Sequence, residues 1–99
     1  MNKYNVECTD TFGGEANYSW VQRASVTMPE LIHYGYTGSA DGSWRKASKT
    51  YRRELMRRAK KAMGYTGVRG KVYDDGDIIE FRPHGLCQVM FIYFDDSGV

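Results

Sequence analysis

The chain has 99 residues, of which 14 are Lys or Arg and 12 are Asp or Glu, and its formal net charge is +2. With 41% hydrophobic and 14% aromatic residues, its composition excludes an intrinsically disordered chain. Because domains commonly contain about 100–150 residues, we expect a single domain over residues 1–99. A domain of this size buries roughly 60–65% of its unfolded surface, which allows one modest core and excludes a deep, multi-layered active site.

The hydropathy pattern contains neither a signal peptide nor a membrane span. Residues 1–7 have no apolar run of the length that a secretory signal requires. The longest apolar stretch, residues 86–94, has nine residues and contains Gln88, whereas a membrane-spanning helix needs about 20. We therefore expect a cytoplasmic protein without a membrane partner.

The two cysteines, Cys8 and Cys87, are too few for a disulfide framework, and we expect both to be small buried apolar side chains. Together with His33 and His84 they could form a zinc set. However, zinc sites usually draw on two close pairs of ligands, and only His84 and Cys87 are close in the sequence. The sequence therefore favours a turn histidine beside a core cysteine, with no metal and no cofactor.

The N-terminal third predicts a long antiparallel hairpin. Residues 3–11 alternate polar and apolar side chains, as a half-buried strand does. A pair of glycines then supplies a turn, and residues 17–26 resume the extended pattern. Residues 27–30 predict a short helical turn, with Thr27 as its cap and Pro29 in its first turn.

Residues 33–43 predict a loop, because they contain three glycines among Tyr, Ser and Asp residues. The loop contains Tyr34 and Tyr36, and loops usually carry fewer large apolar side chains. These tyrosines have two interpretations: they fold back over the edge of the core, or they form an aromatic contact loop. Both are therefore candidate binding residues.

Residues 43–63 predict one long helix, with Ser43 as its N-cap and Gly64 at its end. At 100° per residue, a narrow apolar arc faces the core and contains Trp44, Ala47, Tyr51, Leu55, Ala59 and Ala62. The opposite arc is basic. It provides the main candidate binding residues: Arg45, Lys46, Lys49, Arg52, Arg53, Arg57, Lys60 and Lys61.

The C-terminal third predicts two or three more strands. Residues 71–73 lead into an acidic turn at 74–77, and residues 77–82 form a strand. Residues 86–94 are apolar on both faces and are expected in the middle of a sheet, followed by a solvated tail at 95–99. The fold class is therefore α+β: an antiparallel sheet of four to five strands in β-β-α-β-β order, with the long basic amphipathic helix packed on one face.

The small net charge conceals a strong separation of charge along the chain. Residues 45–71 contain eleven basic residues and one acidic residue, a charge of +10, and the rest of the chain carries −8. One interpretation is a solvated face that the acidic strands partly neutralise. However, like charges at i,i+4, such as Arg53 and Arg57, destabilise a helix by about 0.2–0.5 kcal/mol each. We therefore favour a polyanionic partner, either nucleic acid or an acidic protein surface.

Two further features of the sequence narrow the function. The predicted helix contains no Asn or Gln, which favours contacts to phosphates over contacts to bases. No catalytic motif is present: the glycine-spaced residues 64–70 lack the Gly-Lys-Ser/Thr ending of a phosphate-binding loop, and no serine lies in a Gly-x-Ser-x-Gly frame. The acidic residues of 74–80 lack the pattern of an EF-hand and are expected to form a turn. We expect a binding protein, not an enzyme.

Three segments, residues 12–20, 33–36 and 79–83, resemble small bacteriophage-encoded proteins, most of them uncharacterised. The resemblance implies a non-enzymatic inhibitor that binds and blocks a host nucleic-acid-processing or defence complex, such as a CRISPR effector, in the host cytoplasm. Its partner would be a host protein or ribonucleoprotein. The alternative is an accessory or regulatory protein that binds DNA or RNA through the basic helix at 45–61. Faces of opposite charge also allow a homodimer.

Overall fold

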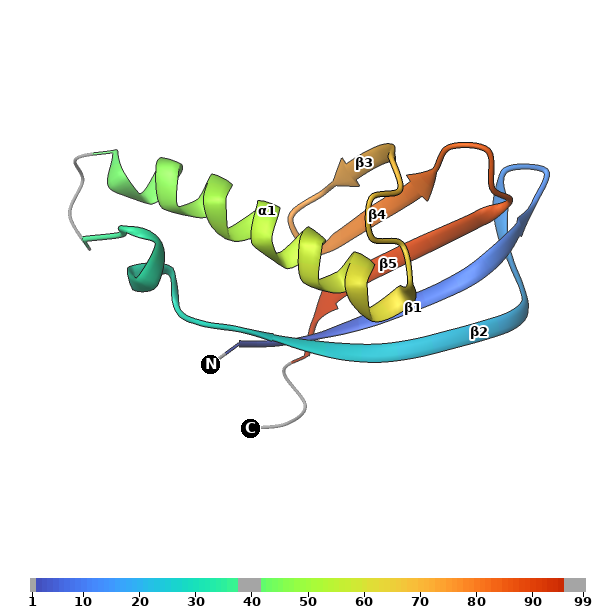
Figure 1. Cartoon of the computed structure of the whole chain (residues 1–99), viewed down its shortest axis with the longest axis horizontal. Coiled ribbons are helices and arrows are strands. Elements are labelled where there is room, and N and C mark those ends of the chain that lie inside the picture. Colours follow the sequence, from blue (N-terminus) through green and yellow to red (C-terminus); the bar gives the residue numbers. More distant parts are fainter. Residues whose placement is uncertain (1, 38–41, 96–99) are drawn as a thin grey trace.

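The chain folds into an antiparallel sheet with one long helix across one of its faces (Figure 1). The computed structural model describes residues 2–37 and 42–95. Its elements are β1 (Asn2–Phe12), β2 (Glu15–Met28), the short 3-10 helix η1 (Leu31–Tyr34), α1 (Ser43–Met63), β3 (Gly70–Asp74), β4 (Ile78–Pro83) and β5 (Gln88–Phe94). The described strands form one five-stranded sheet in the order β2-β1-β5-β4-β3. The α+β class is confirmed.

The predicted order of elements is incomplete, because three strands follow the helix where β-β-α-β-β has two. The additional strand is β3, which pairs with β4 alone and forms one edge of the sheet. An edge strand with exposed side chains has no periodic apolar pattern that would reveal it in the sequence. Gly70 begins this strand. A Cβ atom at Gly70 would lie 2.2 Å from the carbonyl oxygen of Arg82, so β3 can approach β4 only with glycine here.

The prediction that residues 86–94 lie in the middle of the sheet is confirmed, because β5 lies between β1 and β4. Its Met90 and Ile92 belong to the core beneath α1. Val89 is also fully buried although it alternates with Met90 and so lies on the other face. On that face Arg82 donates a hydrogen bond of 2.6 Å to the carbonyl oxygen of Gly14, a contact that crosses β5 and holds the β1–β2 hairpin near β4.

The predicted helix at 43–63 is confirmed, but its buried face differs from the predicted arc. The buried helix residues are Ala47, Tyr51, Leu55, Ala59 and Met63, each four positions after the last. Because four residues turn about 400°, this row winds around the helix by about 40° per step. Such a row makes contact when a helix crosses its neighbours obliquely. At the two ends of the predicted arc, Trp44 and Ala62 are therefore exposed.

The connection between β2 and α1 also differs from prediction. Strand β2 continues to Met28, with Thr27 paired to Lys3, so Thr27 caps no helical turn. The helical turn is η1, which begins two residues after Pro29. Proline lacks the N–H that a strand needs, so the strand ends before it.

The two ends of α1 show one prediction wrong and one confirmed. Ser43 is not an N-cap: it is the first helical residue, and its Oγ accepts a hydrogen bond of 3.2 Å from the N–H of Thr37. Gly64 ends the helix as predicted, with φ of 78° and its N–H directed to the carbonyl oxygens of Lys60 and Lys61. The predicted loop residues 38–41 lie outside the described residues.

The two cysteines have different environments. Cys8 is buried as predicted, with its Sγ 2.8 Å from the hydroxyl oxygen of Tyr65. Cys87 is exposed, so the prediction of a core cysteine beside His84 is wrong. The reason is its position: it immediately precedes β5 in the exposed turn that follows β4. Within residues 2–37 and 42–95, no three His, Cys, Asp or Glu side chains are grouped to hold a metal ion.

Two further predictions concern the membrane and the C-terminus. None of the described helices combines the length and the apolar character that crossing a bilayer would need. Asp95 does not begin a free tail, because its N–H donates a hydrogen bond of 2.9 Å to the carbonyl oxygen of Lys3. Residues 96–99 of the predicted tail lie outside the described residues.

Candidate functional site

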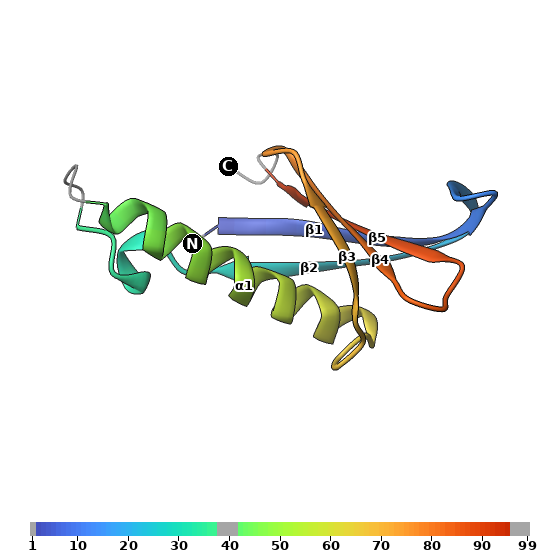
Figure 2. The same ribbon diagram turned by 90° about the horizontal axis from the view of Figure 1, so that it is seen from above.

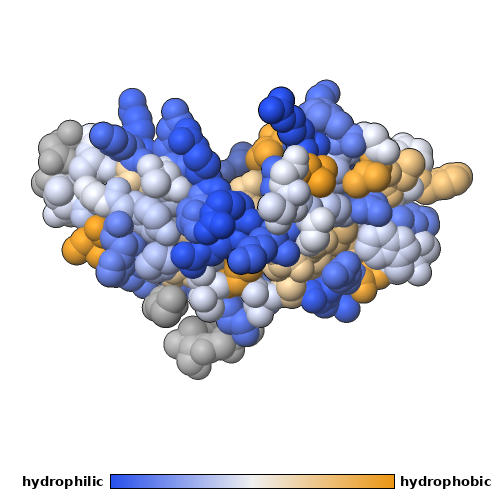
Figure 3. Space-filling view, in the orientation of Figure 1, coloured by the Kyte–Doolittle hydropathy of each residue, from blue (hydrophilic) through white to orange (hydrophobic). Residues whose placement is uncertain are grey.

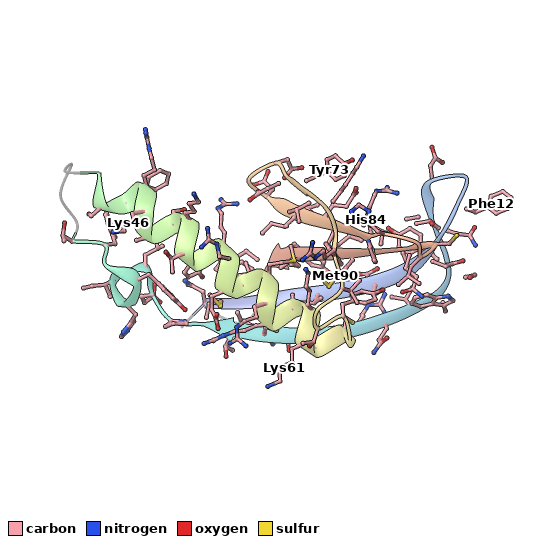
Figure 4. All side chains as sticks on the ribbon, turned by 45° about the horizontal axis from the view of Figure 1, so that its top comes forward. Phe12, Lys46, Lys61, Tyr73, His84 and Met90 are labelled. Carbon is pink, nitrogen blue, oxygen red and sulfur yellow. The ribbon has the colours of Figure 1, made fainter. Side chains whose placement is uncertain are left out.

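The basic residues of α1 lie on a different face of the helix from the buried row. Arg45, Lys49, Arg53, Arg57 and Lys61 are also spaced by four residues, and we call them the basic row. All five are exposed. At 100° per residue the basic row runs parallel to the buried row and about 160° away from it, with neighbours about 6 Å apart along the helix axis. Lys61, at its end, points away from the strands (Figure 4).

Three of the eight predicted binding residues are held by other parts of the molecule. Arg52 forms an ion pair with Asp74 of β3. Arg57 donates two hydrogen bonds to Glu54, from Nε at 2.9 Å and from Nη2 at 2.5 Å. Lys60 donates a hydrogen bond of 2.9 Å to the carbonyl oxygen of Val68, and its ammonium lies 4.4 Å from the centroid of the Phe81 ring.

The other five predicted binding residues project into solvent. Within the described part of the chain, they form neither an ion pair nor a side-chain hydrogen bond: Arg45, Lys46, Lys49, Arg53 and Lys61. Positive charge on the outward face of α1 is therefore mostly unneutralised by the fold.

Arg58, which the sequence analysis did not include, serves the fold. It donates one hydrogen bond to Glu54 at 2.9 Å and another to the carbonyl oxygen of Thr27 at 2.7 Å, which ties α1 to β2. Hydrogen bonds from Arg57 and Arg58 lower the pKa of Glu54 from 4.5 to about 2. Glu54 is therefore ionised at neutral pH and neutralises charge on the β2 side of the helix.

On its other side, α1 leaves a groove. The helix backbone lies nearest to β2 and η1. One cavity lies between the helix and β3–β4, and a second lies beneath the first turns of the helix, bordered by η1, the ends of β1 and β5, and the turn between β3 and β4. The space-filling view shows a hollow between the helix and these strands, with hydrophilic side chains gathered on the helix side (Figure 3). This groove has two parts, both of which border Arg52 and Ile79.

The part of the groove near the middle of α1 is a cavity of about 480 Å³, which we call the basic chamber. Four cationic side chains from the helix line it, together with the carboxylate of Asp74, which pairs with the first of them: Arg52, Arg53, Arg57 and Lys60. Met56, Val72 and Ile79 supply apolar surface. The basic chamber therefore combines positive charge with an apolar floor.

The part of the groove beneath the first turns of α1 is a cavity of about 610 Å³, which we call the aromatic chamber. Five aromatic side chains line it: Tyr4, Tyr36, Trp44, Tyr51 and Phe94. The cavity exists because the first turns of α1 extend past the ends of the strands, where the helix has no sheet to pack against (Figures 1 and 2).

Both predicted tyrosines of the 33–43 segment fold back onto the body of the protein. The ring of Tyr34 packs edge-on against Tyr51, with centroids 5.7 Å apart. Tyr36 lies on the wall of the aromatic chamber. Tyr34 thus matches the interpretation of packing at the edge of the core, whereas Tyr36 is half-buried and borders a cavity.

The phenol groups of the aromatic chamber form a small hydrogen-bonded cluster. The hydroxyl oxygens of Tyr4 and Tyr51 are 2.9 Å apart, and Asn2 Nδ2 donates a hydrogen bond of 3.1 Å to that of Tyr51. Burial, and then the hydrogen bond with Tyr51, raise the pKa of Tyr4 well above its usual value of 10. Tyr4 is therefore an uncharged part of the chamber wall at neutral pH.

Trp44 is the functional candidate that sequence reasoning missed. Its position on the predicted apolar arc placed it in the core, yet its side chain is 56% exposed and borders the aromatic chamber. One signal in the sequence could have identified it: the apolar residues spaced by four that end at Met63 wind around the helix, and Trp44 does not belong to this row.

The acidic residues of 74–77 form a turn, as predicted. The Asp75 carboxylate accepts hydrogen bonds from the N–H groups of Asp77 and Ile78, at 3.0 and 2.8 Å, which lower its pKa. Asp74 accepts another, of 3.0 Å, from the N–H of Gly76 and pairs with Arg52. These carboxylates are thus engaged in local structure.

Comparisons with known proteins add no family to this description. No family model matches the chain, and neither a curated protein nor a solved structure matches it significantly. The resemblance to small bacteriophage proteins therefore stays a prediction.

Proposed function

We propose that this protein is a nucleic-acid-binding protein that contacts the phosphate backbone through the basic row of α1. The observation that carries the proposal is the outward projection of Arg45, Lys49, Arg53 and Lys61 without ion pairs among the described residues. Repulsion between like charges four residues apart costs stability, and a polyanion lying along the helix relieves it. Arg and Lys recognise phosphates without reading sequence, so the proposal is of backbone contact.

The test is a fluorescence anisotropy titration with short DNA and RNA at two salt concentrations. Four to six phosphate contacts give a log–log salt slope of about −4 to −5 on a duplex and about −3 to −4 on a single strand. The double variant K49E/R53E reverses two exposed charges of the basic row. Its matched control, R69E/K71E, changes the net charge equally at exposed residues outside the helix. We expect the first variant to bind much more weakly and the second to retain most of the wild-type affinity; equal losses would contradict the proposal.

A second candidate is the non-enzymatic inhibitor of a host nucleic-acid-processing or defence complex. The observation that favours it is the sheet face opposite α1, where Tyr73 and Ile78 are 51% and 43% exposed. Exposed apolar groups on the sheet face that the helix leaves uncovered suit a protein partner better than they suit phosphates. Capture from host lysate treated with nuclease distinguishes the two candidates. A partner retained after nuclease treatment favours the inhibitor, and one lost favours direct binding to nucleic acid.

A further inference from the structure

We propose that the groove between α1 and β3–β4 binds an unpaired nucleotide segment, with a base in the aromatic chamber and its phosphates along the basic chamber. The inference rests on the proposed function and deepens it, because it assigns single strands as the preferred class of nucleic acid. Binding of this kind combines a positively charged groove with aromatic side chains on which bases stack. Both features lie on one side of α1 and meet at Arg52 and Ile79.

The aromatic chamber has the size and the surface that a base requires. Its volume of about 610 Å³ falls within the roughly 300–1,000 Å³ of small-molecule sites. The rings of Trp44 and Phe94 are 56% and 51% exposed, so a base can reach both. The phenols of Tyr4 and Tyr51 hydrogen-bond to each other, which fixes the inner wall. Stacking on exposed rings is tolerant of sequence because every base has a flat π-face.

The charges along the groove specify which part of a nucleotide goes where. Arg53, Arg57 and Lys60 line the basic chamber, whose one carboxylate, Asp74, pairs with Arg52, so the chamber attracts phosphate. The aromatic chamber shares Arg52 and borders two further carboxylates, those of Glu30 and Asp77. Carboxylates repel phosphate but accept hydrogen bonds from the N–H groups of unpaired bases, thymine N3–H included. A ligand with an anionic end and a neutral, flat, N–H-bearing end fits this division, and a nucleotide has both.

The shape of the groove discriminates against a duplex. The basic row projects outward and can lie on the phosphates of either a single strand or a duplex. The aromatic chamber is a half-open recess between η1, the first turns of α1 and the turn at Gly76. Bases in a duplex are paired and stacked, so they enter such a cavity only after a costly unstacking. The groove therefore adds affinity for single strands alone.

Trp44 provides a direct reporter of base stacking. The chain has two tryptophans, and Trp20 lies on β2 outside both chambers. In the variant W20A, Trp44 is the sole source of tryptophan fluorescence. We expect oligothymidylate to quench this emission as it saturates the protein, and a duplex to leave it unchanged. Saturable binding of the single strand without quenching would overturn the inference.

Two substitutions in the aromatic chamber test how much base stacking contributes to the free energy of binding. W44A removes the exposed stacking surface, and S48F fills the chamber from the helix. Because stacking contributes about 1–3 kcal/mol per base, we expect each to weaken oligothymidylate binding about 5- to 150-fold and to leave duplex binding unchanged. W20A is the matched control and retains affinity for the single strand.

The outcomes separate this inference from the proposed function. If K49E/R53E abolishes binding while W44A and S48F have no effect, or weaken single-strand and duplex binding equally, the basic row binds nucleic acid and the groove does not. If no DNA or RNA binds at low salt, both proposals fail. Thermal unfolding of each variant confirms that the loss of affinity occurs in a folded protein.

Discussion

The two halves of α1 contact the rest of the molecule in different ways. The C-terminal half is packed directly on the sheet, and its Ala59 and Met63 belong to the same core as Phe81. The first turns extend past the strands, where Trp44 is half exposed and the aromatic chamber lies beneath the helix. One continuous helix thus supplies rigid packing at one end and a cavity wall at the other. The packed half can hold the wall in place without filling the cavity.

The largest effect on stability is expected from Leu55→Ala, at the centre of the helix. Leu55 is 1% exposed and packs in the core, so truncation creates a cavity that costs about 2–5 kcal/mol. Urea unfolding followed by circular dichroism measures the change in the free energy of unfolding. A loss below about 1 kcal/mol would mean that the helix is held to the sheet by other contacts.

A matched pair of enlargements compares the two halves directly. Ala59→Leu adds volume where the side chain is fully buried and is expected to cost about 1–3 kcal/mol. Ser48→Leu adds similar volume at the wall of the aromatic chamber, where space is available, and is expected to change stability by less than about 0.5 kcal/mol. Equal destabilisation by the two substitutions in urea unfolding would contradict the difference between the halves.

The ion pairs of Glu54, in the packed half of α1, predict that the free energy of unfolding depends on pH. The folded-state pKa of Glu54 is about 2, below its ordinary value of 4.5, so its contribution is complete above about pH 4.5 and is lost as the pH falls through 2. Glu54→Gln removes it. Because the pair is at the surface, we expect a loss below about 1 kcal/mol at pH 7 that disappears near pH 2.

The control for Glu54 is Glu15→Gln, at the exposed first residue of β2. The Asp10 carboxyl has a pKa of about 2 and therefore changes the stability of every variant in the same pH range. The free energy of unfolding of each variant is therefore compared with that of the wild type at the same pH. A difference between wild type and Glu54→Gln that is the same at pH 7 and pH 2 would contradict the assigned ion pairs.

The smallest effect on stability is expected from Trp44→Ala at the projecting end. A side chain that is 56% exposed and borders a cavity has little packing to lose, so the change is expected within about 0.5 kcal/mol. Thermal unfolding measures it. A loss of about 2 kcal/mol or more, which is typical of truncated core residues, would show that Trp44 stabilises the fold. Trp44 would then not be available as the stacking surface of the aromatic chamber.

The same comparison explains what the sequence could and could not predict. The apolar run of β5, the bounds of α1 and its basic residues follow from periodicity and composition, because each depends on local sequence. The position of Trp44 depends on how far α1 projects beyond the strands, which is a property of the assembled tertiary structure. The pairing of Arg52 with Asp74 likewise depends on β3, an edge strand without an apolar pattern.

The central claim is that the basic row of α1 lies on phosphates, and the salt dependence of affinity tests it most directly. We expect wild-type binding of oligothymidylate to have a log–log salt slope of about −3 to −4. Each phosphate contact removed lowers the magnitude of the slope for a single strand by about 0.7, so K49E/R53E should lower it by about 1.4. A wild-type slope near zero, or a slope that this variant leaves unchanged, would contradict the claim.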